Sequence, residues 1–133
     1  MQTMRYINLL DKISRVKTNK CFIYNNTIIF AVPSFKVSKA IGPNAINIKK
    51  LQERLGKKVR IIREPRGLND AETFVSDIVA PAKFKSLEVK DKMINITAGS
   101  VQNKASLLGR NKRRYLELKK ILMGIFGTDV KVL

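Results

Sequence analysis

The pattern of hydrophobic and polar positions divides the first half of the chain into six elements. Apolar residues recur at helical spacing between Thr3 and Arg15, which predicts an amphipathic helix. Two β-branched and aromatic runs flank Asn25-Asn26, a pair that tolerates the positive φ of a tight hairpin turn. We expect the apolar side of the first helix to carry Met4, Ile7, Leu10 and Ile13. The elements that follow this helix are strands over 21–24 and 27–32, a short helix to Ile41, a helix over 44–55 and a strand over 58–63.

The second half of the chain repeats this order of elements. Asn69 or Asp70 is expected to cap a helix that ends near Pro81, and Ser100 to cap a short helix that ends at Leu108. The other predicted elements are strands over 84–89 and 93–98, a long helix carrying Tyr115, Leu118, Leu122 and Ile125, and a last strand near 128–133.

A connector rich in turn formers, 64–67, separates the two halves. We therefore predict two domains, 1–66 and 67–133, in an α+β (α/β) fold. Each has the order α-β-β-α-α-β, with a three-stranded sheet packed on helices.

Two glycine-led tetrapeptides lie between the short and the longer helix of each half. They are Gly42-Pro43-Asn44-Ala45 and Gly109-Arg110-Asn111-Lys112, and they are 67 positions apart. A glycine has no Cβ, so a sugar-phosphate chain can approach the backbone closely there. The next helix adds amide N–H groups and a partial positive charge, both of which favour phosphate. On its own, such a turn is also compatible with a simple helix break.

Basic and apolar residues flank both tetrapeptides. Cations near the start of a helix oppose its dipole, and an anion would relieve that conflict, so we expect the second loop to bind phosphate more strongly. The opposing interpretation is that these cations form a solvated surface. The candidate phosphate-binding neighbours are Lys49, Lys50, Arg113 and Arg114, and the candidate base-groove residues are Ile41, Ile46 and Leu108.

The charge of the chain favours a polyanionic partner. Lys and Arg number 27 against 10 Asp and Glu, for a net charge of +17. There is no histidine and a single cysteine, Cys21, which removes the commonest general base and any cysteine zinc site. We expect a monomeric, cytoplasmic protein that is not an enzyme, needs no metal or cofactor and makes no membrane contact.

Two stretches carry a resemblance to a known family. Ile41-Gly42-Pro43-Asn44-Ala45-Ile46-Asn47-Ile48-Lys49-Lys50-Leu51 resembles the glycine loop of a type II KH domain, and Phe74-Val75-Ser76-Asp77-Ile78-Val79-Ala80-Pro81-Ala82-Lys83 resembles the apolar helix and Pro-Ala break of the tandem KH region of NusA. The resemblance covers essentially the whole chain and is closest to the short archaeal form.

The resemblance implies binding of single-stranded nascent RNA, linked to transcript elongation and termination, with no cofactor. RNA polymerase is a further candidate partner, although bacterial members contact it through domains for which this chain has no room. The family loop is G-x-x-G, and its last glycine is replaced here by Ala45 and by Lys112.

Two other functions fit the same composition. A basic assembly protein with degenerate loops would dock on RNA polymerase or on ribosomal particles. A general coat for duplex DNA would not depend on the loops at all. We favour RNA binding, because the loop occurs twice at equivalent places.

Overall fold

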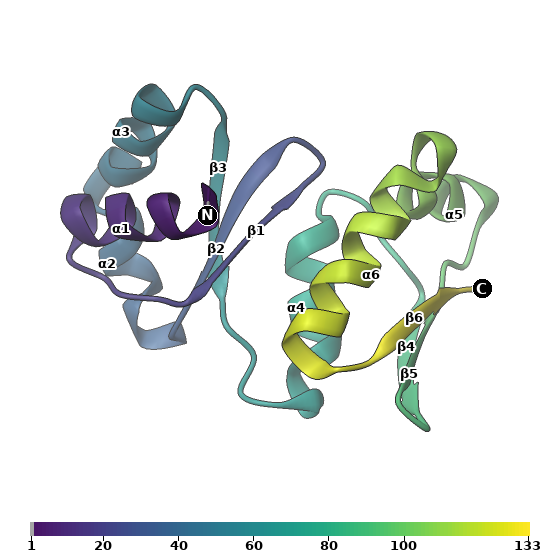
Figure 1. Ribbon diagram of the computed structural model, residues 1–133. Helices are drawn as coiled ribbons and strands as arrows, with labels where there is room; N and C mark the ends of the chain where they lie inside the picture. Colours follow the sequence, from purple (N-terminus) through teal and green to yellow (C-terminus); the bar gives the residue numbers. More distant parts are fainter. Residues whose placement is uncertain (1) are drawn as a thin grey trace. The chain divides into compact units, whose positions relative to one another are not determined.

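The computed structural model describes residues 2–133, and these form two compact units that divide between Glu64 and Pro65 (Figure 1). Both units combine helices with one three-stranded sheet, so the expected mixed α+β class is confirmed. The order α-β-β-α-α-β also holds in each unit.

The first unit has a mixed sheet of order β1-β2-β3, in which β1 pairs antiparallel and β3 pairs parallel with β2. Its elements are α1 (Gln2–Ser14), β1 (Lys20–Tyr24), β2 (Thr27–Val32), the 3₁₀ turn η1 (Ser34–Lys36), α2 (Val37–Ile41), the 3₁₀ turn η2 (Pro43–Ala45), α3 (Ile46–Leu55) and β3 (Lys58–Arg63).

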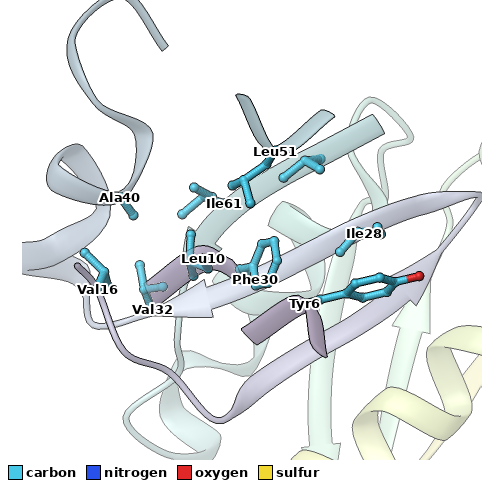
Figure 2. Close-up of a cluster of buried hydrophobic side chains, with 10 residues drawn as sticks. Tyr6, Leu10, Val16, Ile28, Phe30, Val32, Ala40, Leu51 and Ile61 are labelled. Carbon is cyan, nitrogen blue, oxygen red and sulfur yellow. The ribbon is translucent and has the colours of Figure 1, made fainter. Parts of the chain in front are cut away.

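The core of the first unit lies between this sheet and its helices (Figure 2). Leu10 of α1, Phe30 of β2 and Leu51 of α3 are fully buried in it. One part of the predicted apolar side of α1 is wrong, because Met4 is 67% exposed while Tyr6 is buried. Tyr6 and Leu10 are four residues apart and lie one turn above each other, so this pair directs the helix toward the sheet.

The second unit repeats the arrangement, with the sheet order β4-β5-β6 and the same antiparallel and parallel pairings. Phe74 of α4 and Leu118 of α6 are buried, and the Phe74 ring meets Phe126 edge-on at a centroid distance of 5.8 Å. The elements are the 3₁₀ turn η3 (Leu68–Asp70), α4 (Ala71–Val79), β4 (Ser86–Lys90), β5 (Met93–Thr97), α5 (Val101–Leu108), the 3₁₀ turn η4 (Arg110–Lys112), α6 (Arg113–Phe126) and β6 (Asp129–Val132).

The hairpin turns are also alike in the two units. Each hairpin turns through two residues of positive φ, Asn25-Asn26 in the first unit and Asp91-Lys92 in the second. Ser100 caps α5 as predicted, because its hydroxyl accepts a hydrogen bond from the Asn103 amide at 3.0 Å. Asp70 precedes α4 but makes no side-chain cap bond, and its carboxylate accepts from the Arg66 amide at 2.9 Å.

Candidate nucleic-acid interface

The first glycine loop is a tight 3₁₀ turn between α2 and α3. Gly42 has φ 78° and ψ 165°, a conformation that is accessible mainly to glycine. Its amide donates a hydrogen bond to the Ser38 carbonyl at 2.9 Å, and this bond ends α2. The Ala45 amide then donates to the Gly42 carbonyl at 3.1 Å, and the Ile46 amide donates to Pro43. These two amides are therefore already engaged within the loop, so cationic side chains must supply a larger part of any attraction for phosphate.

The second loop follows the same backbone course. Gly109 has φ 72° and ψ 178°, its amide donates to Ala105 at 2.9 Å, and the Lys112 amide donates to the Gly109 carbonyl at 3.2 Å. Asn111 and Lys112 both adopt the left-handed conformation, at φ 56° and 58°. Two copies of one loop geometry are thus preserved although their sequences share only the glycine and the asparagine.

The last position of each loop has a conformation that suits glycine, although neither residue there is a glycine. Ala45 has φ 56° and ψ 32°, and Lys112 has φ 58° and ψ 24°. A non-glycine residue in this region costs about 1–2 kcal/mol. The rest of each turn therefore imposes the loop shape on a residue that would otherwise avoid it.

A side chain from the following helix braces each loop. Asn47 Nδ2 donates to the Lys39 carbonyl at 3.2 Å, and Arg114 Nη1 donates to the Ser106 carbonyl at 3.2 Å. Both pairs are eight residues apart and are related by the same offset of 67. Arg114, a candidate phosphate ligand, thus also holds the end of α5 through one of its five N–H donors.

These braces also explain why glycine is needed at the head of each loop. A Cβ on Gly42 would lie 2.9 Å from Asn47 Nδ2, and one on Gly109 would lie 2.7 Å from Arg114 Cγ. Asn47 was not among the predicted site residues. The signal that could have identified it is its offset of 67 positions from Arg114, the same offset that relates the two loops.

The predicted site residues differ in exposure. Ile46 is 43% exposed at the start of α3, while Ile41 and Leu108 are half-buried. Gly42, Ala45, Gly109 and Arg114 are also half-buried. The exposed members are Pro43, Asn44, Lys49, Lys50, Arg110, Asn111, Lys112 and Arg113. Two exposed cations, Arg110 and Lys112, therefore lie in the second loop, and exposed Arg113 follows at the start of α6, whereas the first loop itself carries no cation.

Lys50 lines a groove between α1 and α3. The groove has a volume of about 490 Å³, with Leu9 and Ile13 from α1 and Lys50, Glu53 and Arg54 from α3 among its lining residues. Lys49, exposed in the first turn of α3, is the closer of the two lysines to the loop along the chain.

The remaining chemistry of the described residues is sparse. Burial raises the pKa of the Cys21 thiol from 9.0 to about 12, so it is protonated at neutral pH. Residues 2–133 contain no cluster of three or more His, Cys, Asp or Glu side chains able to hold a metal ion. Within the same range, no helix combines the length and the apolar character that crossing a bilayer requires.

The chain is similar to curated NusA-like proteins. It is 24% identical over 98 residues to "Probable transcription termination protein NusA" of Halococcus morrhuae. The matched stretch covers 74% of this chain and 68% of that protein. It is 32% identical over 84 residues to the protein of the same name in Methanocaldococcus jannaschii. That matched stretch covers 63% of this chain and 44% of the relative. These matches confirm the resemblance to the NusA family. The chain thus spans about two thirds of the first relative and under half of the second.

Among solved structures, the crystal structure of APE1850 has the same fold. It superposes with a TM-score of 0.69 at 24% identity, over 99% of this chain and 98% of that one. No protein-family model matches the chain.

Proposed function

We propose that this protein binds single-stranded RNA through two tandem type II KH domains, 1–66 and 67–133. The observation that carries the proposal is the repetition of one loop geometry, led by Gly42 and by Gly109, between equivalent helices of two α-β-β-α-α-β units. KH domains grip four backbone nucleotides with such a loop. A net charge of +17 supplies the long-range attraction for a polyanion.

In this proposal the loops hold phosphates and the neighbouring apolar residues receive bases. Arg110, Lys112 and Arg113 are exposed around the second loop, and they make it the stronger phosphate clamp. Ile41 and Ile46 in the first unit, and Leu108 in the second, provide apolar surface for unstacked bases. In addition to its proposed phosphate contact, Arg114 positions the loop through its hydrogen bond to the Ser106 carbonyl.

The names of the curated relatives support a role in transcription. Both are called transcription termination proteins, so nascent RNA is the substrate class that we propose for this chain, with an effect on elongation or termination. RNA polymerase is the protein partner that such a role implies.

The test is binding of a labelled single-stranded RNA pool, followed by fluorescence anisotropy over several salt concentrations with duplex DNA as competitor. The loop variant combines Arg110→Asp with Asn111→Asp. The matched control combines Lys90→Asp with Ser86→Asp, two exposed positions on β4 where one basic and one neutral residue are changed in the same way. Circular dichroism verifies that both variants remain folded.

We expect the loop variant to lose far more RNA affinity than the control, while both lose the same affinity for duplex DNA. Equal losses on RNA would show that charge alone attracts the ligand. In that case the proposed KH function fails, and capture of RNA polymerase or ribosomal particles by the purified protein becomes the next experiment.

A further inference from the structure

A large aromatic side chain projects into solvent at the start of the helical segment that leads to the first glycine loop. Phe35 lies in η1, between β2 and α2, and is 82% exposed. An exposed phenylalanine forgoes the free energy that its burial would provide, so its ring contributes little to the stability of the fold.

The backbone turn that carries this ring is well defined. Pro33 precedes η1, and the Lys36 amide donates to the Pro33 carbonyl at 2.8 Å, which closes the turn. The Lys36 ammonium lies 5.7 Å from the centroid of the Phe35 ring. The turn thus places a positive charge over one face of an exposed aromatic ring.

One face of this helical segment runs from Phe35 to the loop glycine, Gly42. Phe35, Lys39 and Gly42 follow one another at spacings of four and three residues, which places them near one face of a helical rod. The rod is about 11 Å long between Phe35 and Gly42. Lys39 is exposed between them, and no Asp or Glu occurs anywhere between Asp11 and Glu53.

We propose that Phe35 stacks an unpaired base of the bound RNA, while Lys36 and Lys39 attract the adjoining phosphates. The inference rests on the proposed function and extends the RNA footprint beyond the loop, along α2. Stacking on an exposed aromatic ring beside basic residues is a general means of binding single strands, because every base has a π face.

The charge around Phe35 favours RNA over a protein partner at this position. The chain between Asp11 and Glu53 carries basic side chains and no carboxylate, which suits a polyanion. A flat ring that is 82% exposed, with the Lys36 ammonium over one face, suits a nucleobase that stacks on the other face.

The second unit has no aromatic ring at the comparable place. The residue 67 positions after Phe35 is Gln102, and its neighbour Val101, which begins α5, is aliphatic and 86% exposed. Base stacking is therefore assigned to the first unit. Val101 consequently provides a matched control of similar exposure.

The absence of tryptophan from the chain allows a direct spectroscopic test. Phe35→Trp introduces a single indole at the proposed stacking position, and Val101→Trp introduces one at the control position. Each is titrated with a single-stranded RNA of about 12 nucleotides, three times the four that a KH loop grips. In parallel, anisotropy compares the RNA affinities of the native protein, Phe35→Ala and Val101→Ala.

We expect RNA to quench the emission of Phe35→Trp strongly and that of Val101→Trp little. Phe35→Ala should bind RNA between about 5-fold and about 150-fold more weakly, which is the range of one base–aromatic stack. Phe35→Trp should retain the native affinity, and Val101→Ala should lose less than Phe35→Ala.

The outcomes separate this inference from the proposed function. If RNA binding depends on the second loop but Phe35→Ala binds like the native protein, the stacking inference alone is overturned. It is also overturned if Phe35→Ala weakens binding but the Phe35→Trp emission does not change. If the native protein shows no loop-dependent RNA binding, the proposed function fails and this inference falls with it.

Discussion

Ala45 and Lys112 occupy the last position of their loops, where the family has a second glycine. Both adopt positive φ, and the hydrogen bond from each amide back to the leading glycine fixes that conformation. The loop shape is thus determined by the leading glycine, the 3₁₀ turn and the brace from the next helix, rather than by a glycine at the last position. An Ala or Lys at the strained position is tolerated at a cost in stability.

Replacing Ala45 by glycine should therefore stabilise the protein. Relief of the left-handed strain outweighs the extra flexibility that glycine gives the unfolded chain, so we expect the free energy of unfolding to rise by about 0.5–1 kcal/mol. Urea denaturation measures the change. Ala105→Gly, the same substitution at an exposed position inside α5, should lower stability by about 0.5–1 kcal/mol. Loss of stability in Ala45→Gly would show that the turn does not strain Ala45.

Cys21 provides a prediction about pH. Because burial raises its pKa to about 12, from 9.0 for a free thiol, the native state retains the proton more tightly than the unfolded state does. The stabilising contribution is therefore complete below pH 9 and is lost as pH rises toward 12. Denaturation midpoints of the native protein and of Cys21→Val, compared from neutral to alkaline pH, isolate this group because other titrations cancel. We expect the native midpoint to fall relative to that of Cys21→Val. A constant difference would mean that the thiol ionises equally in both states.

At the scale of elements, the sequence predicts best where turn chemistry and alternation agree. The strand Lys58–Arg63 has the predicted bounds, and Asn25-Asn26 forms the predicted hairpin turn. The strand β4 begins at Ser86 rather than at 84, because the preceding segment lacks an alternating pattern strong enough to fix its end. The helix α3 begins at Ile46 rather than at 44, since Asn44 and Ala45 are left-handed.

Side-chain placement is harder to predict than the elements themselves. Met4 and Tyr6 are both apolar enough to face a core, and only packing against β2 selects Tyr6. For the candidate site, the glycines and their flanking cations were identifiable from spacing and charge. The exposure of Phe35 was not, because it depends on where neighbouring elements lie in space, and the brace by Asn47 had only its offset of 67 from Arg114 as a signal.

At the scale of the whole molecule, the charge excess attracts any polyanion, so loop-dependent binding must be distinguished from this background. Each phosphate contact on a single strand contributes about −0.7 to the slope of log K against log salt. Changing Arg110, Lys112 and Arg113 together to alanine should therefore make the slope on single-stranded RNA about 2 units shallower if each cation contacts one phosphate.

The control changes three exposed cations of the same unit outside the loop, Lys83, Lys90 and Lys131, to alanine, which lowers the net charge equally. The electrostatic field of the molecule weakens by the same amount in both variants. The slopes of log K against log salt on RNA therefore differ only if the loop cations contact phosphates. With duplex DNA, which a glycine loop does not grip, the two variants should show equal slopes. Equal slopes on RNA as well would mean that the charge of this protein acts as a diffuse field, and that the second loop is not its phosphate clamp.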